Sequence, residues 1–324
     1  MNKEDVIIIG GGPCGLAAAI ALADAGRSAL VIEKGNIVDS IYRYPTHQTF
    51  FSSSEKLEIG DVAFITENRK PVRLQALSYY REVVRRRDVR VRTFEKVESV
   101  TKNSNGSFMV RTSKDHYEAS QVVVATGYYD NPNYMGIKGE TLPKVFHYFK
   151  EGHPFFGCDT AVIGGKNSSV DAALELVKSG ARVTVIYRGS EYSKSIKPWI
   201  LPEFESLVRH GIITMEFNAD VREITEDSII YEASGSTKKI KNDFVFAMTG
   251  YHPDHSFLQK MGIEIDPLTG KPIHDPETMQ TNVEGIYIAG VIAAGNDANE
   301  IFIENGRFHG ALIAEHIVHH SEKK

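Results

Sequence analysis

The stretch VIIIGGGPCG at residues 6–15 decides the fold of this chain. A buried apolar strand runs into three glycines, and an alanine-rich apolar stretch follows, which indicates a strand, a tight turn and a helix. Gly10 permits the turn, Gly12 lets a pyrophosphate approach the backbone, and Gly15 lets the helix pack against the strand. The free N–H groups at the start of the helix favour a phosphate. The stretch therefore predicts a dinucleotide-binding crossover.

A carboxylate ends the second strand of this crossover. The strand is expected at residues 28–33, SALVIE, and it closes on Glu33. A carboxylate at this point can accept both hydroxyl hydrogens of an adenosine ribose, so it favours a nucleotide without a 2′-phosphate. The first site is therefore predicted to take FAD or NAD and not NADP.

A second crossover begins at residues 160–169, TAVIGGKNSS, and returns as a strand at residues 182–188. Gly164 keeps the turn, while Lys166 and Ser169 replace the second and third glycines of the first copy. Asn167 and Ser168 complete this turn and are assigned to nucleotide binding with Gly164 and Lys166.

The charge at the end of the second copy is opposite to that of the first. Arg188 is expected in the place that Glu33 holds, where a guanidinium can pair with a 2′-phosphate. Lys194 and Lys197 follow in the same loop and add positive charge. The second site is therefore predicted to prefer NADPH, with a surface cation after a strand as the alternative interpretation of Arg188.

The remaining segments complete a predicted α/β fold with two Rossmann-like dinucleotide-binding domains, the second inserted in the first. Residues 1–127 and 251–324 are expected to form the FAD-binding domain, and residues 128–250 the NADPH-binding domain. A buried strand closes on Thr126 and Gly127, an ending that lets the backbone approach a flavin nucleotide. Further predictions are a functional loop at 36–68, a helix at 74–87, strands at 89–97, 107–112, 121–127, 244–250 and 285–290, and a helix at 302–319.

Composition excludes several classes of function. A net charge of −5 and a pI near 6.2 argue against a nucleic-acid partner. No apolar run has the length of a membrane span, and the chain enters a core strand within five residues, so a cytoplasmic protein is expected. The two cysteines, Cys14 and Cys158, form no CxxC, and no metal site is predicted. Cys158 precedes a core strand and is expected to be an inert buried thiol.

Several motifs taken together carry a resemblance to a known family. They are GGGPCG at residues 10–15, QTFFSSSEKLEIG at 48–60, GGKNS at 164–168 and GNDAN at 295–299. On these motifs the chain resembles the bacillithiol-disulfide reductases of the YpdA type, within the thioredoxin-reductase-like flavoproteins that bind two dinucleotides. The resemblance covers nearly the whole chain.

The resemblance implies an FAD enzyme that uses NADPH to reduce the disulfide of a low-molecular-weight thiol, and it implies Cys14 as the redox residue. Thioredoxin reductases carry a CxxC before the second crossover, whereas this chain has only Cys158 there. Their final strand ends in Gly-Asp, but Val291 replaces that acid here, and Asp297 is the candidate substitute. A homo-oligomer is also expected. The further residues assigned to cofactor binding are Pro13, Cys14, Lys34, His47, Gln48, Val97 and Ile301.

The chemistry of Cys14 follows from its place in the first turn of the first helix. The helix dipole is expected to stabilise a thiolate and lower the pKa of the thiol. The structural alternative is that this position asks only for a small residue. His47, His147 and His309 are candidate proton donors to a leaving thiolate, with polar loop residues as the simpler interpretation.

Other functions remain open at this level. A ferredoxin or flavodoxin NADP reductase on the same scaffold also lacks CxxC. A flavin monooxygenase is a third hypothesis, supported by Phe146, His147 and Tyr148 before the second crossover. A redox sensor without turnover is a fourth.

Overall fold

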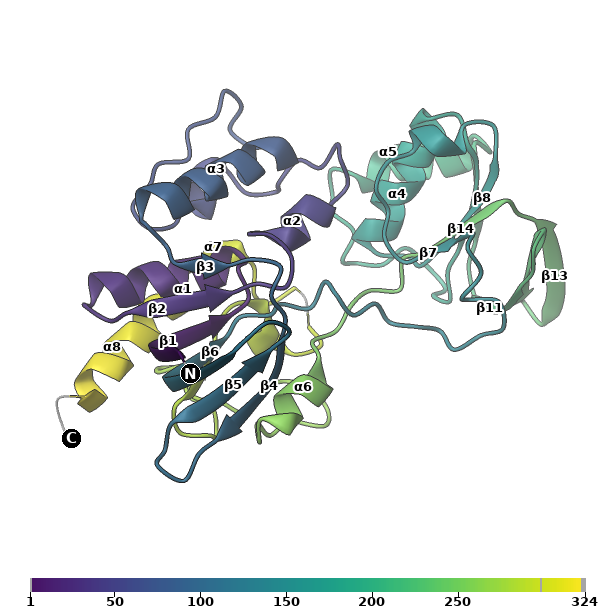
Figure 1. Cartoon of the computed structure of the whole chain (residues 1–324). Coiled ribbons are helices and arrows are strands. Elements are labelled where there is room, and N and C mark those ends of the chain that lie inside the picture. Colours follow the sequence, from purple (N-terminus) through teal and green to yellow (C-terminus); the bar gives the residue numbers. More distant parts are fainter. Residues whose placement is uncertain (1, 298, 322–324) are drawn as a thin grey trace. The chain divides into compact units, whose positions relative to one another are not determined.

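The protein divides into two compact units, which we describe from a computed structural model. The structure describes residues 2–297 and 299–321. Unit 1 comprises Met1–Asn131 and Tyr251–Lys324, and unit 2 comprises Pro132–Gly250 (Figure 1). Residues 1, 298 and 322–324, which belong to the predicted FAD-binding segments, lie outside the described residues. Which nucleotide each unit binds stays a prediction.

Unit 1 is built on a sheet with the strand order β3-β2-β1-β6-β5-β4, in which β15 also pairs with β6. The pairs of β1 with β2, β1 with β6, and β6 with β15 are parallel. The strands are β1 (Asn2–Ile9), β2 (Ala29–Ile32), β3 (Val91–Arg92), β4 (Val97–Lys102), β5 (Phe108–Thr112), β6 (His116–Val124) and β15 (Ile286–Ile288). The helices are α1 (Pro13–Asp24), α2 (Asp39–Arg43), α3 (Arg73–Arg86), α6 (His255–Lys260), α7 (Ile303–Gly306) and α8 (His309–Ser321), with 3-10 turns η1 (Ser54–Leu57) and η3 (Val291–Ala294).

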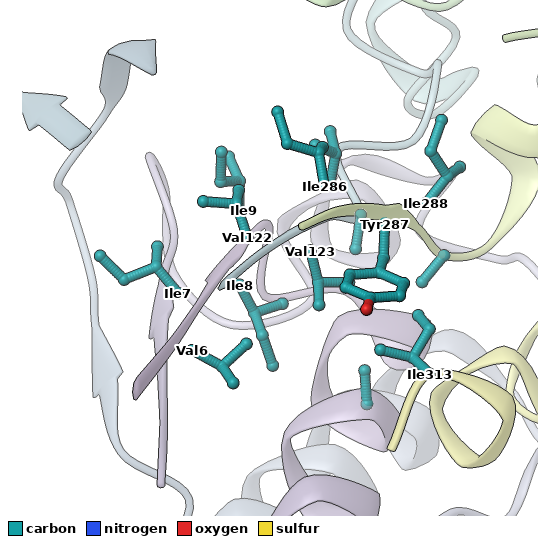
Figure 2. Close-up of a cluster of buried hydrophobic side chains, with 14 of the residues drawn as sticks. Val6, Ile7, Ile8, Ile9, Val122, Val123, Ile286, Tyr287, Ile288 and Ile313 are labelled. Carbon is teal, nitrogen blue, oxygen red and sulfur yellow. The ribbon is translucent and has the colours of Figure 1, made fainter. Parts of the chain in front are cut away.

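The core of unit 1 explains the continuous apolar run of its first strand. The last four residues of β1 are buried, because neighbouring strands flank β1 and helices cover the sheet (Figures 1 and 2). Helices α1 and α8 pack closely, since a Cβ at Gly310 would lie less than 3.0 Å from Ala18. The ring of Tyr287 lies beside Ile313 of α8 (Figure 2), and its hydroxyl is 3.0 Å from Nδ1 of His316. The glycine turn after β1 therefore follows directly from a buried, well-packed strand.

Unit 2 repeats this design on a smaller parallel sheet of order β10-β9-β8-β14-β7. An antiparallel sheet of order β11-β12-β13 belongs to the same unit. The elements are β7 (Val145–Phe146), η2 (His153–Phe155), β8 (Asp159–Ile163), α4 (Asn167–Lys178), β9 (Arg182–Ile186), α5 (Leu201–Arg209), β10 (Ile213–Glu216), β11 (Ala219–Ile224), β12 (Ser228–Ala233), β13 (Ser236–Lys241) and β14 (Phe244–Ala247). The parallel strand pairs in the main sheets of both units, with helices between them along the chain, confirm the predicted α/β class.

Two elements predicted as continuous are each broken into two pieces. The strand expected at 89–97 is interrupted, because Phe94 adopts a left-handed φ of 55° between β3 and β4. The two pieces also pair differently, β3 in parallel with β2 and β4 antiparallel with β5. The helix expected at 302–319 is split between α7 and α8, since Asn305 and Gly306 are weak helix formers.

Candidate functional site

The first glycine turn has the geometry of a phosphate cradle. Gly10 has a φ of 110°, and its N–H donates to the carbonyl of Ile32 at 2.9 Å. A Cβ at Gly15 would lie less than 3.0 Å from the Gly10 carbonyl, so this approach of helix to turn requires glycine. A Cβ at Gly12, the N-cap of α1, meets nothing within 4 Å. The turn therefore leaves open the space that a pyrophosphate would occupy.

Glu33 follows β2 and is held in place by the backbone. Its carboxylate accepts N–H groups from Gly11 at 2.7 Å and from Gly35 at 2.8 Å. Burial raises the pKa of Glu33, and these two hydrogen bonds act in the opposite direction. The side chain is only 7% exposed and lies against Gly11 in the turn. A fixed carboxylate beside an open phosphate cradle fits the adenosine and pyrophosphate of FAD.

The other residues predicted to bind FAD are spread around this turn in unit 1. Lys34 forms an ion pair with Asp130 at 2.6 Å. Val97 is buried at the start of β4, close to Glu95, whose N–H donates to the Glu33 carbonyl at 2.9 Å. Thr126 and Gly127 follow β6, and Pro13 opens α1.

The predicted loop residues lie further from the turn in sequence and are more exposed. His47 is exposed, and the carbonyl of half-buried Gln48 accepts the N–H of Arg73 at 2.8 Å. Asp297 is exposed and accepts the N–H of Asn299 at 3.0 Å. Ile301 packs near Gly306, where an added Cβ would lie 3.2 Å away. The structure brings Ile301 near the first turn, since Gly306 itself borders Cys14.

Cys14 is enclosed by two glycines from distant parts of the chain. A Cβ added at Gly290 or at Gly306 would lie 3.0 Å from its Sγ. Burial, together with the carboxylate of Glu304, raises the pKa of the Cys14 thiol to about 12. The expected lowering by the helix dipole is therefore wrong in this structure, because desolvation of the thiolate outweighs the dipole.

The surroundings of Cys14 include groups that the sequence analysis missed. The Cys14 thiol and the Glu304 carboxylate both raise the pKa of Tyr44 and of Tyr80, although burial is the larger cause. Glu304 accepts a hydrogen bond from the hydroxyl of Ser52. Tyr44 directly follows α2, Ser52 lies in the loop after it, Tyr80 belongs to α3 and Glu304 to α7, so no local motif could have grouped them.

The second glycine turn keeps the backbone geometry of the first with different side chains. Gly164 has a φ of 133°, and its N–H donates to the carbonyl of Ile186 at 3.0 Å. Ser169, in the place of Gly15, is fully buried, and its hydroxyl is 3.5 Å from the carbonyl of Met248. The turn therefore accommodates a serine where the first turn requires glycine.

The predicted cations gather at the start of α4 because of one asparagine. The side chain of Asn167 donates to the Ser195 carbonyl at 2.7 Å and accepts the Lys197 N–H at 3.0 Å. These bonds hold the loop that carries Lys194 and Lys197 against the turn. Lys166, Ser168, Arg188 and Lys194 are exposed, and within the described part of the chain these three cations form no ion pair. Exposed cations beside a glycine turn fit the phosphates of NADPH.

The alignment of Arg188 with Glu33 is wrong by one residue. Glu33 stands 23 residues after Gly10, and Tyr187 stands 23 residues after Gly164. The structure agrees, since Glu33 follows β2, which ends at Ile32, and Tyr187 follows β9, which ends at Ile186. Arg188 is thus the counterpart of Lys34.

The remaining candidates behave differently from one another. Cys158 is half-exposed, so the expectation of a buried thiol is wrong: it precedes β8 and lies outside the strand. His147 lies 3.8 Å from Glu140, and burial lowers its pKa. His309 accepts the N–H of Gly290 at 3.2 Å, and burial is the main cause that lowers its pKa to about 4. His309 is therefore neutral at pH 7 and supports the strand end beside Cys14.

Within residues 2–297 and 299–321, no group of three or more histidine, cysteine or carboxylate side chains is placed to hold a metal ion. One His-x3-His pair, His316 and His320, was missed in the sequence, and its ring centroids lie 4.0 Å apart. None of the described helices combines the length and apolar character that crossing a bilayer requires.

Comparison with known proteins gives a consistent result. The family model described as pyridine nucleotide-disulphide oxidoreductase matches residues 7–290. The chain is 71% identical to the bacilliredoxin reductase Bdr of Bacillus subtilis (strain 168), over 98% of both chains.

Two solved structures agree with this result. The bacillithiol disulfide reductase Bdr (YpdA) of Bacillus cereus is 70% identical with a TM-score of 0.97, covering 98% of this chain and all of that one. The reductase of the same name from Staphylococcus aureus is 58% identical with a TM-score of 0.96, over the full length of both chains. The resemblance stated from the sequence motifs is confirmed.

Proposed function

The chain belongs to the pyridine nucleotide-disulphide oxidoreductase family, and we propose that the disulfide it reduces is bacillithiol disulfide. It is an FAD-containing, NADPH-dependent disulfide oxidoreductase. The observation that carries the substrate proposal is the likeness of the whole chain to two reductases named for bacillithiol disulfide.

Unit 1 is the proposed site of FAD. The open space at Gly12 would hold the pyrophosphate, and the Glu33 carboxylate would accept the ribose hydroxyls. When bound there, FAD would supply hydride acceptance from NADPH and two-electron transfer to a disulfide. The protein's part is to hold the two nucleotides and to orient the substrate.

Unit 2 is the proposed site of NADPH. The start of α4 would bind the pyrophosphate, helped by Lys166 and by the loop that Asn167 anchors. Arg188 and Lys194 would pair with the 2′-phosphate, since they are exposed cations next to the turn.

Cys14 is proposed as the thiol that meets the substrate. Its sulfur attacks one sulfur of the disulfide, a mixed disulfide forms, and the first bacillithiol leaves with a proton. Two electrons and two protons, supplied by one NADPH and one proton from solution, then cleave the mixed disulfide, release the second bacillithiol and return the Cys14 thiol. The net reaction consumes one NADPH and one proton for each disulfide.

The high pKa of Cys14 makes a proton acceptor necessary. Glu304 is the carboxylate whose charge acts on this thiol, and Ser52 holds it by a hydrogen bond. When Glu304 takes the proton it becomes neutral, so the repulsion that opposed the thiolate disappears. We therefore assign Glu304 as the base for Cys14.

An anaerobic experiment tests this proposal. NADPH should bleach the flavin of the wild-type protein, and bacillithiol disulfide should restore its absorbance. The variant Cys14→Ala should lose at least about a hundredfold in disulfide turnover and keep electron transfer from NADPH to a dye. Full disulfide turnover in this variant would remove Cys14 from the reaction, and transfer only to ferredoxin would favour the ferredoxin reductase alternative.

The curated relative is named for bacilliredoxin, which makes that protein a second candidate substrate. Assays with purified bacillithiol disulfide as the sole substrate distinguish the small disulfide from bacilliredoxin. Turnover without added bacilliredoxin supports the small disulfide, whereas turnover only when bacilliredoxin is present supports the protein substrate.

Two further proposals concern the state of the protein. A cytoplasmic location is supported by its two cysteines, which are both free. A homo-oligomer is supported by exposed apolar side chains in unit 1, among them Tyr42, Leu74 and Phe308. Light scattering that gives a single chain of 36.0 kDa would contradict the oligomer.

A further inference from the structure

Tyr187 occupies in unit 2 the place that Glu33 occupies in unit 1. Both residues directly follow the second strand of their crossover, at the same distance from the first glycine of the turn. The backbone around them matches, because Gly10 and Gly164 each donate an N–H to the last residue of that strand. The side chain at this place is the one that reads the 2′ side of an adenosine ribose in a dinucleotide crossover.

The ring of Tyr187 lies across the turn in the same way as the carboxylate of Glu33. In unit 1, a Cβ at Gly11 would lie 3.1 Å from the Cβ of Glu33. In unit 2, a Cβ at Gly165 or at Gly189 would lie less than 3.0 Å from the Tyr187 ring. Glycine at these two positions therefore makes room for the ring, and any larger residue would displace it.

The hydroxyl of Tyr187 is available to a ligand. The side chain is half-exposed, and among the described residues its hydroxyl makes no hydrogen bond and its ring has no aromatic partner. Glu33 differs, since both of its carboxylate oxygens accept backbone N–H groups. A phenol can donate a hydrogen bond where a carboxylate can only accept one.

We infer that Tyr187 is a specificity-determining residue, which selects the phosphorylated ribose of NADPH. A carboxylate at this position would repel a 2′-phosphate, while the neutral tyrosine removes that repulsion and donates its hydroxyl hydrogen to a phosphate oxygen. The exposed guanidinium of Arg188, the next residue, supplies the positive charge. This inference rests on the proposed NADPH site of unit 2.

The test measures binding and not turnover. Titration calorimetry on the FAD-loaded protein gives the Kd of adenosine 2′,5′-bisphosphate and of 5′-AMP. The Kd of 5′-AMP divided by the Kd of the bisphosphate reports selectivity for the 2′-phosphate. Tyr187→Glu should lower this ratio by about a hundredfold, because two like charges would meet. Tyr187→Phe should lower it by about tenfold, since one hydrogen bond to a charged group is lost.

A matched control is Tyr192→Phe in the same unit, whose ring packs on Phe204 and Phe217 and which should keep the wild-type ratio. Flavin content and thermal unfolding check that each variant is folded. An unchanged ratio in Tyr187→Glu overturns the inference, and an unchanged ratio in Tyr187→Phe overturns the donor role. Wild-type protein that binds neither nucleotide would instead refute the NADPH site itself.

Discussion

The two glycine turns of this protein are built on one backbone plan but differ in their side chains. Gly10 and Gly164 both have a positive φ and both accept no side chain, because a Cβ would collide with the neighbouring strand end. Where the first turn continues with Gly15, the second has Ser169. The turn itself therefore requires glycine at its first position. Whether the position five residues later must also be glycine depends on how closely the helix approaches the turn.

The residues that directly follow β2 and β9, Glu33 and Tyr187, differ for another reason. Glu33 is buried and tied to two backbone N–H groups, whereas Tyr187 is half-exposed with its hydroxyl left to solvent. Neither residue is required by the strand, since β2 and β9 pair in the same way with their neighbours. At this point of the crossover the two units therefore differ in the side chain beside the turn and not in the strand pairing.

The two cysteines give the largest expected contrast between the units. Burial raises the pKa of the Cys14 thiol to about 12, so the thiolate that reacts with alkylating agents is scarce at pH 8. Both cysteines are partly exposed, but Gly290 and Gly306 enclose the sulfur of Cys14. Iodoacetamide should therefore alkylate Cys158 at least about tenfold faster than Cys14, as measured by peptide mass spectrometry.

The variant Cys158→Ser isolates Cys14 in the same experiment. Its alkylation rate should rise about tenfold per pH unit between pH 7 and pH 10, because the thiolate fraction rises in that proportion. Labelling of Cys14 as fast as that of Cys158 in the wild-type protein would contradict the enclosure of its sulfur by Gly290 and Gly306.

Exchanging Gly15 and Ser169 for each other's residue tests whether only the first turn requires glycine at this position. Gly15→Ser should destabilise unit 1 by about 3 kcal/mol and lower its flavin content, because the new Cβ would collide with the Gly10 carbonyl. The reciprocal change Ser169→Gly should cost about 1 kcal/mol, measured by denaturant unfolding. Equal losses in the two variants would show that the turns do not differ in this respect.

Removing the carboxylate of unit 1 tests the role given to Glu33. Glu33→Ala should weaken FAD binding and destabilise the protein by about 2 kcal/mol, since two buried N–H groups lose their acceptor. Glu33→Gln retains an acceptor oxygen and should lose about half as much. Flavin retention after dialysis is the measurement, and full retention in Glu33→Ala would refute the role.

The smallest predicted effect concerns pH and His309. Its pKa is about 4 in the folded protein, below the ordinary value of about 6.5, so the unfolded chain binds the proton more readily. Its contribution to stability is therefore complete above pH 6.5 and is lost as the pH falls from 6.5 toward 4. We expect a loss of about 1–2 kcal/mol over this range after solvent screening.

The variant His309→Asn keeps an acceptor for the Gly290 N–H without titrating, so its stability should fall less over this range. The control His116→Asn, at an exposed position, should behave as the wild-type protein does. Identical pH profiles for the wild-type protein and His309→Asn would contradict the assignment.

Much of the fold was predictable because its signals are local. An apolar strand, a glycine at the turn and an apolar helix are neighbours in the chain, and β1 with α1 and β8 with α4 form where those patterns occur. The predictions failed at Phe94, where the chain turns without a local signal, and between α7 and α8, where the weak helix formers Asn305 and Gly306 end the first helix.

The sequence by itself determined the two crossovers and the residues of their turns, since spacing along a strand and a helix fixes where such residues lie. Only the tertiary structure decided the state of Cys14, because its neighbours Gly290 and Glu304 come from the other end of the chain. The register of Tyr187 with Glu33 was already present in the sequence, because each stands 23 residues after the first glycine of its turn. Burial and contact depend on residues far apart in sequence, and folding alone brings them together.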